Sequence, residues 1–243
     1  MQIYGLNKLT LLDYPEHVAA VCFTGGCNMR CPYCHNADLV LNASSQTPVD
    51  MKDFFSFLEK RKGIIDGVVI SGGEPTLQAD LIEFIKQIKE YGYLVKLDTN
   101  GTNPDVLGKL IDNHLVDYVA MDIKSSLDVY AVSTGIANFD TSLIVKSVNL
   151  LMNSGIDYEF RTTVCKELHT EALFEGIADL IRGCKKYFIQ SYNDGPAILK
   201  DRINNQKSFP ATLTAYSYDE LASIVEKLKN QGINTYLRGV KES

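Results

Sequence analysis

The chain has 243 residues, of which 45% are hydrophobic and 22% are charged, and its formal net charge is −6. This length and hydrophobic content suffice for one large α/β domain or two small ones. An acidic chain suggests neither a phosphate-binding surface nor a polybasic membrane patch, so we expect no nucleic-acid partner. The N-terminus lacks a basic region followed by a long apolar run, and no stretch approaches the roughly 18 apolar residues of a membrane span. We therefore expect a cytoplasmic protein without membrane contact.

Apolar runs with β-strand character alternate with helical patterns along most of the chain, which predicts parallel strands joined by helices. The predicted strands are Val18–Phe23, Val68–Ile70, Leu94–Leu97, Tyr118–Met121, Tyr158–Val164 and Tyr187–Gln190, with a short last run at Thr235–Leu237. Apolar residues at helical spacing fall between them, in four groups centred near residues 85, 109, 148 and 177. A fifth such group, Leu221 to Leu228, is followed by Gly232 as a helix stop.

Six strand–helix units are too few for a closed eight-fold barrel, so we predict a partial (β/α)6 barrel, with a doubly wound sheet as the alternative. Both folds place the active site at the C-terminal ends of the strands. No repeat or linker divides the chain, which predicts a single domain over residues 1–243. Within it we expect an N-terminal segment 1–17 and a less regular region 193–243, because residues 193–214 lack periodicity and a loop of that length is usually functional or disordered.

Three of the six cysteines, Cys27, Cys31 and Cys34, lie within eight residues directly after the first predicted strand. Disulfides are poor candidates in a reducing compartment. A cubane iron–sulfur cluster has four irons, normally held by four thiolates, so three cysteines would leave one iron open to a substrate. The preceding Gly25 and Gly26 allow the backbone to turn around a bulky group.

Other interpretations of this loop stay open from its residues alone. Cys31 to His35 matches the haem-attachment pattern, but that pattern normally accompanies export and leaves Cys27 without a role. Zinc held by the three cysteines and His35 is chemically reasonable. The cysteines could also be purely structural.

The cysteine spacing, with Tyr33 before the third cysteine, resembles the signature of the radical S-adenosylmethionine (SAM) superfamily. The run Gly72-Gly73-Glu74-Pro75 after the second strand is similar to that family's GGEP motif. Residues 12–36 are more specifically similar to the activating enzymes of glycyl radical enzymes, above all the form that serves anaerobic ribonucleoside-triphosphate reductase. The resemblance covers nearly the whole chain and weakens after about Tyr192.

The resemblance implies a [4Fe–4S] cluster on the three cysteines and SAM at its open iron. The implied SAM contacts are Tyr33, His35, Gly72, Gly73, Glu74, Pro75, Asp98, Thr99, Asn100, Lys124, Arg161 and Asn193. It also implies a possible monovalent cation held by Asp98, Thr99 and Asp122. Asn193 departs from the family, which has a histidine there in the formate-lyase activases.

Each of these motifs also has a structural interpretation. A Gly-Gly pair after a strand is commonly a plain turn. Asp122 and Lys124 could form only a surface ion pair, which would contribute little, and Arg161 could be a salt-bridged structural residue. Asn103-Pro104 is expected to cap and begin a helix after the Asn100-Gly101 turn.

The implied reaction is reductive cleavage of SAM to methionine and a 5′-deoxyadenosyl radical, which abstracts hydrogen from a glycine of a partner enzyme. The implied partners are a glycyl radical enzyme, the anaerobic reductase first, and a flavodoxin or ferredoxin as electron donor. Asp13 to Glu16 falls where the activases hold the substrate peptide, with Glu16 in place of an expected glycine; a turn capped by Asp13 is the alternative.

Two other functions remain in competition: a radical SAM enzyme for a small molecule, such as a deazapurine carboxylate synthase, and a structural zinc or iron–sulfur protein. The remaining cysteines, Cys22, Cys165 and Cys184, are predicted to pack in the core. His17, His114 and His169 are predicted to be surface or capping residues.

Overall fold

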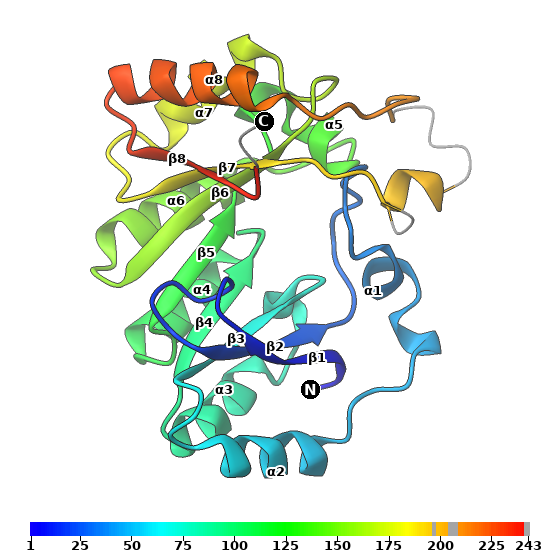
Figure 1. Ribbon diagram of the computed structural model, residues 1–243, viewed down its shortest axis with the longest axis vertical. Helices are drawn as coiled ribbons and strands as arrows, with labels where there is room; N and C mark the ends of the chain where they lie inside the picture. The colour runs from blue at the N-terminus through cyan, green and yellow to red at the C-terminus, as the bar shows by residue number, and fades with distance from the viewer. Residues whose placement is uncertain (196–197, 204–208, 241–243) are drawn as a thin grey trace. The chain divides into compact units, whose positions relative to one another are not determined.

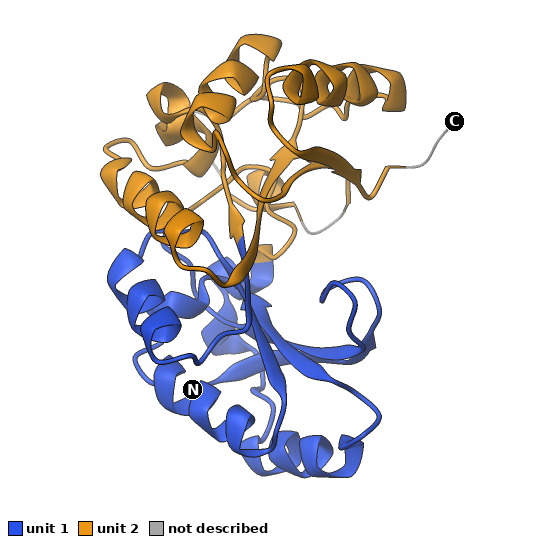
Figure 2. Cartoon of the chain, turned by 90° about the vertical axis from the view of Figure 1, so that its left-hand side faces the viewer, with its two compact units in different colours: residues 1–28, 38–120 blue, residues 29–37, 121–243 orange. Residues whose placement is uncertain are grey.

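The computed structural model describes residues 1–195, 198–203 and 209–240. The chain divides into two compact units (Figure 2). The first contains residues 1–28 and 38–120, and the second contains residues 29–37 and 121–243. Each unit has its strands on one side and its larger helices on the other. The expected single domain over 1–243 stays a prediction.

In the first unit, four strands lie in chain order: β1 (Ile3–Thr10), β2 (Ala19–Thr24), β3 (Gly67–Gly72) and β4 (Leu94–Thr99). Strand β1 pairs antiparallel with β2, whereas β2, β3 and β4 are parallel. Strand β5 (Tyr118–Asp122) carries the chain from the first unit into the second (Figure 1). The parallel strands all end on the same edge, so the turns that follow them are brought together.

The helices that accompany these strands are α1 (Ala37–Leu41), η1 (Ala43–Ser45), α2 (Met51–Arg61), η2 (Pro75–Leu77), α3 (Leu81–Glu90) and α4 (Pro104–Asp112). Helix α3 buries Leu81, Phe84, Ile85 and Ile88, one apolar face at helical spacing. Asp50 caps α2 by accepting a bond from the backbone of Lys52. Asn103 caps α4, and Pro104 begins it, as the sequence predicts.

The second unit contains three parallel strands, β6 (Asp157–Val164), β7 (Tyr187–Ser191) and β8 (Thr235–Arg238). Its helices are η3 (Leu127–Val129), α5 (Tyr130–Thr134), α6 (Ser142–Asn153), α7 (Glu171–Leu180), η4 (Leu199–Asp201) and α8 (Tyr218–Asn230). Helices α7 and α8 pack side by side (Figure 1). A capping box of Ser217 and Glu220 begins α8, and Gly232 follows its end at φ +83°.

The predicted strands are confirmed with ends that differ by at most two residues, but β1 was missed. Its sequence, IYGLNKLT, shows no regular alternation of apolar and polar residues. Strand β1 pairs with β2 on one side, and its central residues are exposed or half-buried. The part of the chain that the structure describes contains no helix long and apolar enough to cross a bilayer.

A chain of buried hydroxyl groups connects β7 and β6 of the second unit to the backbone just after the end of β5. The Tyr187 hydroxyl on β7 donates to Thr162 Oγ1 on β6 at 2.7 Å, and Thr162 Oγ1 donates to the Ile123 carbonyl oxygen at 2.8 Å. The Ile123 amide donates to the Arg161 carbonyl oxygen at 2.8 Å. The backbone between Asp122 and Lys124 is therefore held by β6 through both polar groups of Ile123.

We predict that Tyr187→Phe lowers the free energy of unfolding by about 1 kcal/mol, because it removes one buried hydrogen bond. Tyr236→Phe is the control, since Tyr236 is 41% exposed and its change should stay within about 0.5 kcal/mol. Urea unfolding of both variants and the parent measures the difference. Equal stability of the two variants would contradict the prediction.

Candidate functional site

The entry to the cysteine loop is seated on the turn that follows β3. The Gly73 amide donates to the Thr24 carbonyl oxygen at 2.9 Å, and the Glu74 amide donates to the Gly26 carbonyl oxygen at 2.8 Å. A Cβ on Gly73 would lie 1.9 Å from the Gly26 oxygen, so only glycine fits there. The predicted Gly72-Gly73-Glu74-Pro75 motif and the cysteine loop are therefore joined backbone to backbone.

Asn100, in the turn after β4, contacts the first cysteine of the loop. Its Nδ2 lies 3.8 Å from Cys27 Sγ and 2.9 Å from Asn28 Oδ1. Its Oδ1 accepts bonds from the Thr102 amide at 3.0 Å and the Thr102 hydroxyl at 2.7 Å, so donors fix the orientation of the Asn100 amide. Asn28 and Thr102 were not predicted as site residues. The only signal in the sequence is that they are polar residues next to Cys27 and to the Asn100-Gly101 turn.

Glu74 is a fully buried carboxyl that links the turns after β3 and β4. Its Oε1 accepts from the Thr76 amide at 3.0 Å, the Thr76 hydroxyl at 2.5 Å and the Thr99 hydroxyl at 2.8 Å, and its Oε2 accepts from the Asn100 amide at 2.6 Å. Burial raises the pKa of Glu74, and these four donors oppose the rise. The carboxyl thus fixes Thr99 and Asn100, both predicted site residues.

The three residues predicted to hold a cation have polar partners within their own units. Asp98 accepts from the Ser71 hydroxyl at 3.0 Å and pairs with the ammonium of Lys96. Asp122 is paired with Lys124 and Arg161 in the second unit. The cation site stays a prediction.

In the second unit, Cys31 and Cys34 lie on a tight turn, with the Cys34 amide donating to the Cys31 carbonyl oxygen at 3.0 Å. The Leu199 and Lys200 amides of η4 donate to the carbonyl oxygens of Cys34 and Pro32, at 3.0 and 3.1 Å. This η4 lies in the stretch whose lack of periodicity predicted a functional or disordered loop. Its described residues hold the cysteine turn.

The start of this turn rests on the end of α5. The Arg30 amide donates to the Thr134 carbonyl oxygen at 2.7 Å. Gly135 follows in a left-handed conformation at φ +68°, and a Cβ there would lie 2.6 Å from the Arg30 oxygen. Burial raises the pKa of the Cys34 thiol, so a metal would have to displace its proton.

Tyr33, between these cysteines, is 4% exposed, and its hydroxyl has no hydrogen-bond partner among the described residues. Its ring meets the edge of His169, with centroids 5.8 Å apart and planes at 64°. The prediction that His169 is a surface or capping residue is wrong, because it is fully buried. Burial lowers the pKa of His169 to about 4, so the imidazole is neutral at pH 7.

Asp122 at the end of β5, Lys124 two residues later and Arg161 within β6 form one ion-paired group. Lys124 Nζ lies 3.0 Å from Asp122 Oδ2, and Arg161 Nε lies 2.9 Å from Asp122 Oδ1. Burial would raise the pKa of Asp122, but the charges of Arg161 and Lys124 outweigh it and lower that pKa to about 2. The three side chains are mostly buried, so this is more than the surface pair considered from sequence.

The remaining predicted residues are less enclosed. His35 is exposed and lies beside the ring of Tyr192, with centroids 6.1 Å apart. Asn193 follows Tyr192 and is exposed. Pro75, by contrast, is buried as the first residue of η2.

The segment from Asp13 to Glu16 is joined to the end of β1 by hydrogen bonds. Asp13 Oδ2 accepts from the Thr10 hydroxyl at 2.6 Å, and the Asp13 amide donates to Thr10 Oγ1 at 3.3 Å. Glu16 has φ +66°, the left-handed conformation that favours glycine. The backbone therefore adopts a glycine-like conformation where the family has glycine, although the side chain differs.

The other three cysteines pack in the core as predicted. Burial raises the pKa values of Cys22 and Cys165 to about 12 and that of Cys184 to about 11, which keeps all three as thiols. Among the described residues, no three His, Cys, Asp or Glu side chains gather as a metal-binding set. The loop cysteines divide between the units, Cys27 in the first and Cys31 and Cys34 in the second.

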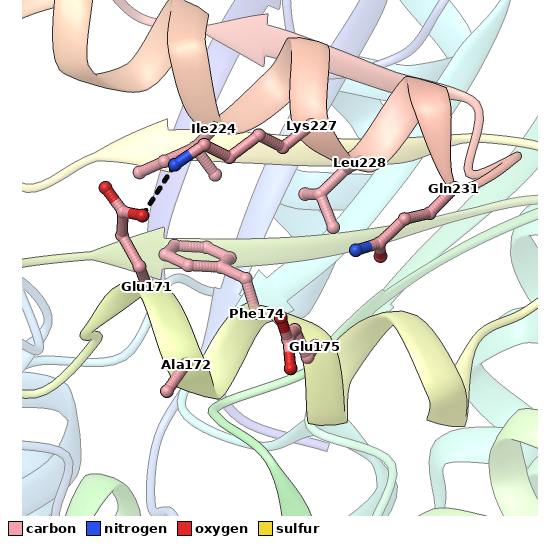
Figure 3. Close-up of a pocket in the computed structure, with 8 residues that line it drawn as sticks. All are labelled: Glu171, Ala172, Phe174, Glu175, Ile224, Lys227, Leu228 and Gln231. Atoms are coloured by element: carbon pink, nitrogen blue, oxygen red, sulfur yellow. Dashed lines mark hydrogen bonds and ion pairs between the residues drawn. The ribbon is translucent and has the colours of Figure 1, made fainter.

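Two cavities lie apart from most of these residues. One, of about 420 Å³, lies between α7 and α8; Phe174 lines it from α7 and Leu228 from α8, and the Glu171–Lys227 ion pair spans the two helices (Figure 3). None of the predicted site residues lines it. The other, of about 470 Å³, is lined by Tyr4, Gln78, Gly25 and Gly26 and adjoins the entry to the cysteine loop.

Comparisons with known proteins match the chain to one family. The model of the radical SAM superfamily matches residues 21–181. The chain is 38% identical over 195 residues to a protein of Methanocaldococcus jannaschii with the provisional name glycyl-radical enzyme activating enzyme MJ1227; the match covers 78% of this chain and 79% of that protein. It is 31% identical over 148 residues to the pyruvate formate-lyase 1-activating enzyme of Escherichia coli K12, covering 58% and 59%.

Solved structures share the fold. Streptococcus suis SuiB gives a TM-score of 0.65 at 14% identity, over 90% of this chain and 48% of that one. A domain of a pyruvate-formate lyase-activating enzyme from Bacteroides vulgatus gives 0.54 at 19% identity, over 72% and 99%. At these identities the likeness concerns the fold alone. Together with the family match, it confirms the predicted partial barrel.

We predict that Glu74→Gln is destabilising by about 2 kcal/mol, because the amide nitrogen would face at least one of the four donors now bound to the carboxylate. The loss of a buried charge offsets only part of this cost. Glu83→Gln is the control, since Glu83 pairs with Lys86 on the surface of α3. Thermal unfolding should show a lower midpoint for Glu74→Gln alone; equal midpoints for both variants would contradict this role of Glu74.

Proposed function

This chain belongs to the radical SAM superfamily, among the activating enzymes of glycyl radical enzymes, and we propose that its substrate is a glycine of an anaerobic ribonucleotide reductase. Membership implies a [4Fe–4S] cluster and SAM as cofactors and a glycyl radical enzyme as partner. The choice of reductase rests on the similarity of residues 12–36 to the activases that serve it. We further propose a flavodoxin or ferredoxin as electron donor.

The residues of the cysteine loop suit the cluster. Cys27, Cys31 and Cys34 form no disulfide within the described part of the chain, and Asn100 presents an amide donor to Cys27 Sγ. Hydrogen bonds to cluster sulfurs are among the factors that set the reduction potential. We propose the three cysteines as the ligands and Asn100 as a residue that supports the first of them.

The residues around the loop suit SAM. The turn at Gly72, Gly73, Glu74 and Pro75 is held close to the loop by the Gly73–Gly26 contact, and we propose that it receives the amino group of SAM. In the second unit, Asp122 orients Lys124 and Arg161. The buried hydroxyl of Tyr33 has no hydrogen-bond partner among the residues that the structure describes. We propose these three as SAM contacts, with lesser contributions from Asp98, Thr99, His35 and Asn193.

When bound, the cluster and SAM supply a one-electron cleavage that yields methionine and a 5′-deoxyadenosyl radical. This chemistry would allow abstraction of hydrogen from a glycine Cα of the partner, with 5′-deoxyadenosine as the product. The protein's own contribution is to hold SAM in one orientation and to exclude water from the reacting atoms. Rigid side chains at strand ends, such as Glu74 and Asp122, serve the first of these tasks.

We predict that Cys31→Ala abolishes iron binding and 5′-deoxyadenosine formation after anaerobic reconstitution with dithionite and SAM. Cys184→Ala is the matched control, because Cys184 is a buried cysteine outside the loop and its loss should leave both measurements unchanged. Iron analysis and chromatography of the nucleoside provide the measurements. A colourless parent protein with stoichiometric zinc and no nucleoside product would overturn the assignment.

The partner is tested by mixing the reduced enzyme and SAM with an anaerobic ribonucleotide reductase from the same source. We predict a glycyl radical by electron paramagnetic resonance, and deuterium in 5′-deoxyadenosine when the reductase carries α-deuterated glycine. A pyruvate formate-lyase serves as the comparison partner. A radical on the lyase but not on the reductase would show that the proposed partner is wrong while leaving the family intact.

A further inference from the structure

His169 is a fully buried imidazole at the edge of the sheet where the proposed SAM contacts of the second unit lie. It follows the end of β6 and precedes α7, in the short connection 165–170. It is 0% exposed. Burying an imidazole is costly unless its nitrogens have hydrogen-bond partners, and both nitrogens of His169 have one.

The hydrogen bonds determine which nitrogen carries the proton. The Cys165 amide lies 3.2 Å from Nδ1 and can only donate, so Nδ1 accepts and carries no hydrogen. Nε2 therefore carries the proton and donates to the Lys124 carbonyl oxygen, 2.8 Å away. The imidazole thus joins the loop after β6, through Cys165, to Lys124, which lies two residues after the end of β5.

Lys124 is held at both of its backbone polar groups by side chains. Its amide donates to the Tyr130 hydroxyl at 3.1 Å, and its carbonyl oxygen accepts from His169. Its ammonium is directed by Asp122. Fixing the peptide groups on either side of the Cα limits the positions from which the long lysine side chain can start.

The same ring makes a T-shaped contact with Tyr33 in the cysteine turn. Edge-to-face aromatic contacts favour a defined ring orientation. The Tyr33 hydroxyl has no hydrogen bond among the described residues, so packing contacts such as this one, and not a hydroxyl bond, orient the ring. One imidazole therefore contacts two residues proposed to face SAM.

We propose that His169 is a positioning residue of the SAM site, which holds the Lys124 carbonyl through Nε2 and the Tyr33 ring through a T-shaped ring contact. The proposal rests on the proposed function, because Lys124 and Tyr33 must contact SAM for it to hold. It assigns to His169 no contact with SAM itself. Its expected effect is on SAM affinity rather than on cluster assembly.

The test compares His169→Gln with His169→Asn in the reconstituted enzyme. The amide nitrogen of glutamine can replace Nε2 and keep the bond to Lys124, whereas the shorter asparagine can replace only Nδ1 and keep the bond to Cys165. We expect His169→Asn to weaken SAM binding by about tenfold, the effect of one lost buried hydrogen bond, and His169→Gln to stay within about threefold of the parent.

SAM binding is measured by calorimetry and by the SAM-dependent change in the resonance spectrum of the reduced cluster, with iron content and thermal midpoint recorded for each variant. Equal SAM affinity in the two variants would overturn the proposal, as would a loss in both that follows iron content or thermal stability. The variant Lys124→Met tests separately whether Lys124 contacts SAM. If it binds SAM like the parent, Lys124 is not a SAM contact and the positioning role is refuted, while SAM cleavage and radical transfer by the parent still support the proposed function.

Discussion

The backbone of Gly73 lies against the backbone of Gly26 with no room for a side chain between them, and the first half of the candidate site depends on this contact. It sets the distance between the turn after β3 and the entry to the cysteine loop. Glu74 can then donate its amide to Gly26 while its carboxylate reaches across to Thr99 and Asn100. Asn100 in turn reaches Cys27. A single close approach of two glycines is thus transmitted through a buried carboxyl to a proposed cluster ligand.

Two buried acids support the site in opposite electrostatic ways. Glu74 is surrounded by neutral donors, so burial dominates and raises its pKa. Asp122 is flanked by Lys124 and Arg161, whose charges lower its pKa to about 2. The Glu74 carboxylate is a rigid link between the turns after β3 and β4, and the loss of any of its hydrogen-bond donors would be costly. Asp122 keeps its charge at any physiological pH, so it directs the two cationic side chains over the whole range in which such an enzyme works.

Much of this arrangement could be predicted from the sequence because it depends on local pattern. Strand periodicity located β2 to β8, and parallel strands necessarily bring their C-terminal turns to one edge. The motifs after β2, β3, β4 and β5 were therefore expected to meet by topology alone. Strand β1 escaped prediction because an edge strand with polar residues at its centre, such as Asn7 and Lys8, has no alternating pattern to detect.

What escaped prediction depends on partners distant in the chain. Nothing near His169 indicates that its ring is enclosed by Tyr33 and Lys124, which lie 136 and 45 positions earlier in the sequence. Histidine is intermediate in its tendency to be buried, so residue type alone does not predict an enclosed ring, and tertiary packing decides. Glu16 illustrates the converse. Its residue type departs from the family, yet its backbone has the left-handed conformation that a glycine would adopt, which costs roughly 1 kcal/mol in a residue with a Cβ. The turn therefore keeps a glycine-like backbone although its residue is glutamate. The hydrogen bonds between Thr10 and Asp13 and the pairing of β1 with β2 determine the path of the chain there.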